Sequence, residues 1–130
     1  MVRYHFDTDF LVKALVTRGP ERDLFKRVSA TVCEIEMSSI AWYEFSRGPR
    51  TPEQLARARA HLEPEGVIAF NEARAELAAE VFRRLGSPRK RAADVAIACT
   101  AIERNARLLT ANLRDYSGID GLQLGVDEAR

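Results

Sequence analysis

Residues 92–110, AADVAIACTAIERNARLLT, place a helix directly before a strand, and this order decides the fold class. The helical part, residues 92–105, is rich in alanine and apolar almost all round until Glu103, as is typical of a buried helix. The apolar residues 106–110 that follow predict a short strand. A buried helix that leads into a short apolar strand indicates a parallel sheet covered by helices.

The same alternation continues in both directions along the chain. Strands are expected at residues 2–6, 31–39, 66–70, 106–110 and 121–125. Helices are expected at residues 9–16, 21–30, 38–48, 51–63, 71–86 and 92–105. Strands that alternate with helices predict an α/β fold in which a central parallel sheet carries helices on both faces. The length suits one domain over residues 1–130.

The bulk composition is that of an ordinary globular chain. Of its 130 residues, 46% are hydrophobic and 30% are charged, and the net charge of +1 indicates no polyanionic partner by itself. No apolar stretch approaches the roughly 20 residues of a membrane span, and the first residues lack the apolar core of a signal peptide. Cys33 and Cys99 form no CxxC pair, which favours buried thiols in a reducing compartment. We therefore expect a cytoplasmic protein.

Three isolated acids fall where predicted strands end or predicted helices begin. Asp7 follows the first strand, Glu44 lies in the helix after the second strand, and Asp94 opens the buried helix. Each has a local explanation. Asp7, like Thr8 or Asp9, can cap the first helix, Glu44 can be an exposed surface residue, and an acid at position 94 suits the helix dipole.

Taken together, the acids predict a shared site. The carboxyl ends of parallel strands meet at one edge of the sheet, and ligands bind there. Crowded carboxylates repel one another and raise each other's pKa, a cost that a hard divalent cation removes. Oxygen ligands favour Mg²⁺ or Mn²⁺ over zinc. His5 is expected inside the first strand as a core residue or beside the site, and Asn112 and Asp115 follow the fourth strand.

Four stretches in this order resemble the PIN domains of VapC-type toxin ribonucleases. They are FDTDFLVKAL (6–15), SSIAWYEFSRG (38–48), DVAIACTAIERNARLLTANLRDY (94–116) and GLQL (121–124). None is specific alone, but their order and separations are. The resemblance implies a three-layer α/β/α sandwich, RNA cleavage that depends on Mg²⁺ or Mn²⁺, a homodimer, and an antitoxin protein as partner.

The resemblance also assigns residues. It implies that Asp7, Glu44, Asp94 and Asp115 are catalytic, and that the metal is held by Asp7, Asp94 and Asn112. The polar residues expected beside these ligands are Thr8, Asp9, Ser39 and Thr110. Asp9 stands where relatives usually carry asparagine or a small residue, and Asn112 is neutral where some relatives carry aspartate. The first change adds negative charge and the second removes it. The sequence is therefore compatible with a site that holds one metal ion and with a site that holds two.

Basic residues beside the acids predict where RNA binds. An acidic site repels RNA, so flanking cations must hold the phosphate backbone. The candidates are Arg47, Arg89, Lys90 and Arg91. In this hypothesis the metal lowers the pKa of a bound water, which attacks the phosphorus in line and leaves a 5′-phosphate and a 3′-hydroxyl. The ribose 2′-hydroxyl is then not needed as nucleophile.

Three alternatives share parts of this pattern. The sequence FDTDF (6–10) also suggests a haloacid-dehalogenase-like phosphatase with Asp7 as nucleophile, but no lysine follows a late strand. A receiver-like signalling domain would carry a lysine after its last strand, where this chain has Val126 and Asp127. A PIN fold that only binds RNA or a protein is the third alternative, and the intact trio of acids argues against it.

Overall fold

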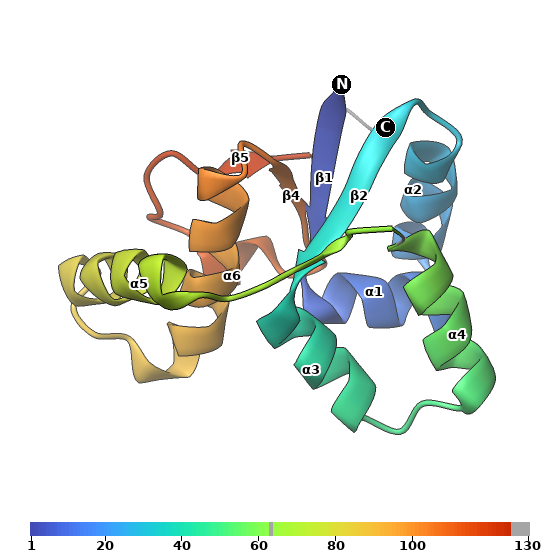
Figure 1. Ribbon diagram of the computed structural model, residues 1–130, viewed down its shortest axis with the longest axis horizontal. Helices are drawn as coiled ribbons and strands as arrows, with labels where there is room; N and C mark the ends of the chain where they lie inside the picture. Colours follow the sequence, from blue (N-terminus) through green and yellow to red (C-terminus); the bar gives the residue numbers. More distant parts are fainter. Residues whose placement is uncertain (63, 126–130) are drawn as a thin grey trace.

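Five parallel strands form the centre of the protein, in the order β3-β2-β1-β4-β5 (Figure 1). The structure, a computed structural model, describes residues 1–62 and 64–125. The strands are β1 (Val2–Phe6), β2 (Cys33–Ser38), β3 (Val67–Ile68), β4 (Arg107–Leu109) and β5 (Gln123–Leu124). All five predicted strands are present, although β3 and β5 are shorter than their apolar patterns suggested.

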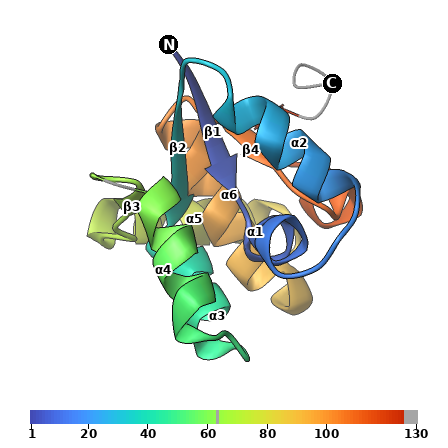
Figure 2. The same ribbon diagram turned by 90° about the vertical axis from the view of Figure 1, so that its right-hand side faces the viewer.

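Helices cover both faces of this sheet. They are α1 (Thr8–Leu15), α2 (Pro20–Ser29), α3 (Ser39–Arg47), α4 (Pro52–His61), α5 (Glu72–Arg84) and α6 (Ala92–Glu103), with short 3₁₀ turns η1 (Arg89–Arg91) and η2 (Leu113–Tyr116). Helices α5 and α6 lie on one face, while α1, α2 and α4 lie on the other (Figures 1 and 2). The predicted three-layer α/β/α sandwich is confirmed. In the described part of the chain, no helix has the length and apolar character needed to cross a membrane.

The strand register aligns the ends of the three central strands. Phe6 pairs with Met37 of β2 on one side and with Leu109 of β4 on the other. The backbone N–H of Asp7 then donates to the carbonyl of Leu109 at 3.3 Å. Residues that directly follow these strands are therefore held at one edge of the sheet, as the sequence predicted for the acids.

The core explains why α6 is apolar almost all round. Residues 95–101 of this helix are all buried, because α6 packs against the sheet on one side and against α5 on the other. On the opposite face of the sheet, the ring of Phe6 lies 5.2 Å from that of Phe10 and 5.4 Å from that of Phe25. Burying such side chains stabilises the fold by about 1.5–3 kcal/mol each.

Helix caps settle alternatives that the sequence left open. Asp7, not Thr8 or Asp9, caps α1, because its side chain accepts from the backbone N–H of Phe10. Ser38 caps α3 by accepting from the N–H of Ile40. The helix predicted to run to residue 63 ends at His61. Glu63, Val126 and Asp127 lie outside the described residues.

Glu36 shows what a strand pattern cannot foresee. In β2, Glu36 alternates with Ile35 and Met37, a pattern that predicts an exposed side chain, yet only 3% of it is exposed. It lies 2.7 Å from Nδ1 of His5 and accepts from Arg104 at 3.1 Å. These contacts keep the pKa of Glu36 below its usual range, against the opposing effect of burial. His5, fully buried, is thus a core residue.

Candidate metal centre

Asp7 fixes the centre of the acidic site. Its side chain is 5% exposed, one carboxylate oxygen accepts from the N–H of Phe10 at 2.8 Å, and the other accepts from the hydroxyl of Thr110. Thr110 follows β4, so one threonine binds the acid that follows β1. Burial raises the pKa of Asp7 to about 6, and hydrogen bonds from Thr110 and Phe10 limit that rise.

Glu44 is oriented toward the same place by a neighbouring helix. The hydroxyl of Thr8 donates to Oε1 of Glu44 at 2.8 Å, which links the start of α1 to the middle of α3. Thr8 also lies 3.4 Å from the carbonyl of Ala41. A threonine directly after Asp7 therefore directs a second carboxylate to the pocket, although 36 residues separate the two side chains.

Asp94 projects from the first turn of α6. Burial and, after it, the charges of Asp115, Asp7 and Glu44 together raise its pKa to about 6. The hydroxyl of Tyr116 donates to Oδ1 of Asp94 at 3.3 Å. Burial and the nearby Asp7 and Asp94 also raise the pKa of Tyr116, so it stays protonated and can act as a donor. The sequence analysis missed Tyr116, because nothing in the sequence around LRDY (113–116) indicates that its hydroxyl reaches Asp94.

These side chains line one pocket of about 220 Å³. The lining residues are Asp7, Thr8, Asp9, Glu44, Arg47, Asp94, Ile97 and Asp115. Five are carboxylates, and within the described ranges none of the five forms an ion pair. Burial is the main reason why Asp7 and Asp94 hold protons more tightly than isolated aspartates do, and repulsion from neighbouring carboxylates adds to it.

The donor set fits a hard divalent cation. Several carboxylate oxygens and no imidazole or thiol line the pocket, which is the chemistry that Mg²⁺ and Mn²⁺ prefer. Among residues 1–62 and 64–125, no three Asp, Glu, His or Cys side chains already stand around a common ion position. Carboxylate side chains must therefore rotate inward when an ion binds. Asp7 and Asp94 are the residues that would hold it.

Two predicted residues contact the pocket less directly. Asn112 donates from its side-chain amide to Asp115 at 2.7 Å, and its backbone N–H donates to Thr110 at 3.0 Å. Ser39 instead accepts from the N–H of Phe70 at 3.0 Å, and so connects α3 to the segment after β3. The structure thus brings together Asp7, Thr8, Asp9, Glu44, Asp94 and Asp115, with Thr110 and Asn112 bound to members of that set.

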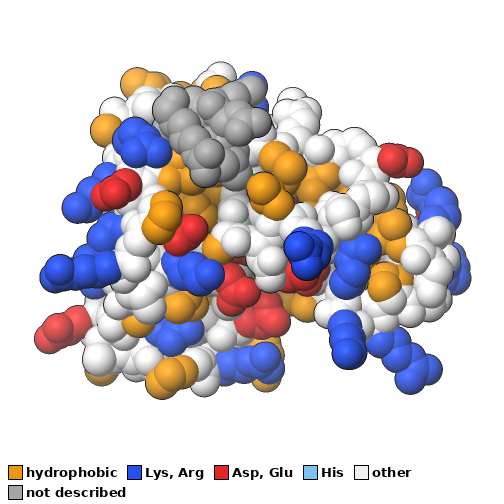
Figure 3. Space-filling view, turned by 180° about the vertical axis from the view of Figure 1, so that it is seen from behind, with side chains coloured by type: hydrophobic (Ala, Val, Ile, Leu, Met, Phe, Trp, Pro, Cys, Tyr) orange, Lys and Arg blue, Asp and Glu red, His pale blue; other side chains and the backbone are white. Residues whose placement is uncertain are grey.

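The basic candidates divide into two kinds. Arg47 lines the pocket, and Arg89 and Lys90 are exposed on η1, just before the helix that carries Asp94. Arg91 donates to the carbonyls of Asp115 and Ser117 at 3.0 and 2.6 Å, and so holds η2 against the start of α6. On the face shown in Figure 3, acidic side chains gather near the centre, with Lys and Arg side chains on either side.

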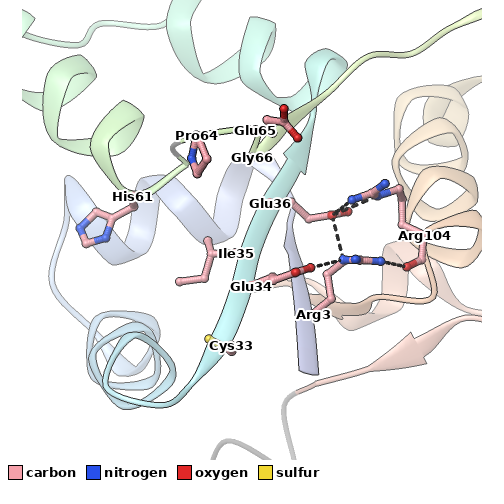
Figure 4. A pocket seen from close by; sticks show the side chains of 10 residues that line it. All are labelled: Arg3, Cys33, Glu34, Ile35, Glu36, His61, Pro64, Glu65, Gly66 and Arg104. Atoms are coloured by element: carbon pink, nitrogen blue, oxygen red, sulfur yellow. Dashed lines mark hydrogen bonds and ion pairs between the residues drawn. The ribbon is translucent and has the colours of Figure 1, made fainter. Parts of the chain in front are cut away.

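A larger cavity, of about 500 Å³, lies beside the outer edge of β2 (Figure 4). Four of its charged groups, Arg3, Glu34, Glu36 and Arg104, are paired with one another. Glu36 lies between the guanidinium groups of Arg3 and Arg104, and Arg3 also donates to Glu34 at 2.7 Å. Because these groups are already paired, this cavity offers a ligand less unsatisfied charge than the acidic pocket does.

The fold and the site together define the class of this protein: it is an α/β/α sandwich with a cluster of carboxylates at the carboxyl edge of its parallel sheet. The profile of the PIN domain family matches residues 4–121, so the chain belongs to the PIN domain family. No curated protein matches the sequence.

Solved structures agree with this assignment. A toxin–antitoxin complex from Klebsiella pneumoniae contains a chain 25% identical, with a TM-score of 0.70, matched over 92% of this chain and 94% of that one. A chain of VapBC-1 from nontypeable Haemophilus influenzae is 27% identical to this chain. The TM-score is 0.66, and the match covers 95% of this chain and 96% of that one. VapBC2 from Rickettsia felis, bound to a promoter DNA fragment, shares the fold at 21% identity and a TM-score of 0.69, over 95% and 97%. The predicted VapC-type PIN domain is confirmed.

Proposed function

We propose that this protein is a metal-dependent endoribonuclease and the toxin of a toxin–antitoxin pair. The observation that carries the proposal is the convergence of Asp7, Glu44, Asp94 and Asp115, from four separate elements, on one pocket. Carboxylates that repel one another are typically found together at sites that bind a cation. Membership of the PIN domain family and the likeness to VapBC complexes support the same reading.

The residues divide the chemistry among them. When bound, Mg²⁺ or Mn²⁺ supplies a water of lowered pKa and neutralises charge on the phosphate. Asp7 and Asp94 hold the ion, and Asn112 acts through its hydrogen bond to Asp115. Glu44, fixed by Thr8, and Asp115 are the remaining carboxylates that can order water or accept its proton.

Flanking cations offset the repulsion between the acidic pocket and RNA. Arg47 lies at the pocket itself, and the exposed Arg89 and Lys90 extend positive charge beyond the start of α6. Such side chains bind phosphates and make affinity fall as salt rises. Arg91 contributes differently, since its hydrogen bonds to Asp115 and Ser117 keep η2 in place.

The proposed partners follow from the relatives. The matched chains from Klebsiella pneumoniae and Haemophilus influenzae come from toxin–antitoxin complexes, so we assign this protein a cognate antitoxin that blocks the acidic pocket. We also assign it a homodimeric state and a cytoplasmic location.

A phosphatase mechanism fits the geometry less well. None of the residues that line the pocket is a lysine. A phosphatase of the haloacid-dehalogenase type would need that cation beside its nucleophile.

The proposed function is tested by incubating the purified protein with total cellular RNA. We expect internal cuts in Mg²⁺ or Mn²⁺ that carry a 5′-phosphate and a 3′-hydroxyl, because water is the nucleophile. EDTA should abolish cleavage. Cuts that persist in EDTA, or that end in a 2′,3′-cyclic phosphate, would show a different mechanism.

A further inference from the structure

One exposed aromatic side chain stands out on α3, the helix that carries Glu44. Tyr43 is 62% exposed, although most large apolar side chains in the described part of the chain are buried. It lies on α3, directly before Glu44 and one helical turn before Arg47. Helix geometry therefore places Tyr43 and Arg47 side by side on the surface of α3.

Arg47 connects this tyrosine to the acids. The guanidinium of Arg47 lies 5.2 Å from the centre of the Tyr43 ring, within the range of a cation–π contact. The same arginine lines the pocket that contains Glu44 and Asp94. The exposed ring is thus held next to the place where the scissile phosphate is proposed to lie.

A flat exposed ring beside a guanidinium suits one class of ligand. Unpaired nucleobases stack on aromatic side chains, and arginine binds phosphate oxygens through paired hydrogen bonds. We propose that Tyr43 stacks against an unpaired base that flanks the scissile phosphate, while Arg47 binds that phosphate. This inference rests on the proposed ribonuclease function and adds the side chain that would position the base beside the scissile phosphate.

The restriction to unpaired RNA has a physical reason. In a duplex each base is already stacked between its neighbours, so its face is not available to a protein ring. A base in a loop or a single strand has a free face and needs only to rotate onto Tyr43. Positive charge at Arg47 favours this mode, because it neutralises the phosphate that comes with the base.

The test compares variants of the protein at Tyr43 on two ligands, an RNA chain with its bases and the same chain without them. Binding of a twelve-nucleotide oligoadenylate is measured in Mg²⁺ by fluorescence anisotropy, in an Asp94→Asn background that suppresses cleavage. The same chain with its bases removed is the matched ligand. Tyr43→Ala removes the ring, Tyr43→Phe keeps it, and Val32→Ala, at an exposed position before β2, is the surface control.

We expect Tyr43→Ala to weaken binding of the oligoadenylate about tenfold, while Tyr43→Phe and Val32→Ala bind as the parent does. The abasic chain should bind all four proteins within about twofold, since stacking is its missing interaction. Equal binding of the oligoadenylate with and without the ring would overturn the proposal. So would an equal loss on the abasic chain, because Tyr43 would then act only through Arg47.

Two further measurements separate this proposal from its neighbours. If Tyr43→Ala changes the molar mass in light scattering but not RNA binding, the ring contacts another copy of the chain and the stacking role is wrong. Cleavage of total RNA by the unmodified protein is recorded in parallel. If the unmodified protein cleaves RNA but Tyr43→Ala binds the oligoadenylate as the parent does, only the stacking role of Tyr43 is wrong. If the unmodified protein cleaves no RNA, the proposed ribonuclease function is wrong as well.

Discussion

Replacing Asp7 by asparagine is expected to reduce Mg²⁺-dependent RNA cleavage at least about 100-fold without unfolding the protein. The loss follows because a neutral amide in place of a carboxylate removes a charged ligand from the ion. The fold should survive, since asparagine is as good a helix cap as aspartate and its amide oxygen can still accept from the N–H of Phe10.

The control for this substitution is Asp23→Asn. Asp23 is also an acid in the first turn of a helix, but it is exposed on α2 and does not line the pocket. Its variant should cleave RNA as the unmodified protein does. Both proteins should give the same circular dichroism spectrum. Wild-type activity in Asp7→Asn would remove Asp7 from catalysis.

The same substitution should stabilise the protein when no metal is present. Burial raises the pKa of Asp7 from 3.8 to about 6, so ionised Asp7 opposes folding at pH 7. A shift of about two units corresponds to an upper limit of roughly 3 kcal/mol, and solvent relaxation reduces it. We expect Asp7→Asn to gain about 1–2 kcal/mol in EDTA at pH 7, which is a rise of roughly 5 °C in Tm.

The pH dependence has a definite sign. Between pH 3.8 and about 6 the folded protein holds more protons on Asp7 than the unfolded chain does, so stability falls as pH rises through this window. Asp94, whose pKa is also raised to about 6, acts in the same direction. Glu36 has a lowered pKa and acts in the opposite direction, so the difference between the unmodified protein and Asp7→Asn removes its contribution and reports Asp7 together with the effect of its charge on Asp94.

Differential scanning calorimetry in EDTA between pH 4 and 7.5 measures this difference. The advantage of Asp7→Asn should be largest above pH 6 and should shrink as the pH falls toward 3.8, where the unfolded chain also takes up the proton on Asp7. If Asp7→Asn is less stable than the unmodified protein at pH 7, burial of the ionised Asp7 carboxylate does not destabilise the fold.

Much of this fold could be predicted because local and global signals agree. The apolar surface of α6 could only be a buried helix, and the strands around it could only be parallel, since helices connect them. The carboxyl-end rule then predicts that Asp7, Glu44 and Asp94 lie at one edge of the sheet. The pocket in the structure contains all three.

What sequence could not supply are contacts between distant segments. Nothing local in LRDY indicates that the hydroxyl of Tyr116 reaches Asp94, or that Thr8 reaches Glu44. Alternation along β2 could not show that Glu36 is buried, because its partners His5 and Arg104 come from another strand and from the end of α6. Such pairs depend on side-chain directions that only the assembled sheet defines.

Direct binding of Mn²⁺ is the measurement that tests the shared carboxylate site most closely. The free ion is quantified by electron paramagnetic resonance at pH 7.5 for the unmodified protein, Asp7→Asn, Asp94→Asn and Asp23→Asn. If the acids hold a common ion, the unmodified protein and Asp23→Asn bind Mn²⁺ saturably, and the other two bind at least about tenfold more weakly. Equal binding by all four proteins, or none by any, would contradict a metal centre built from Asp7 and Asp94.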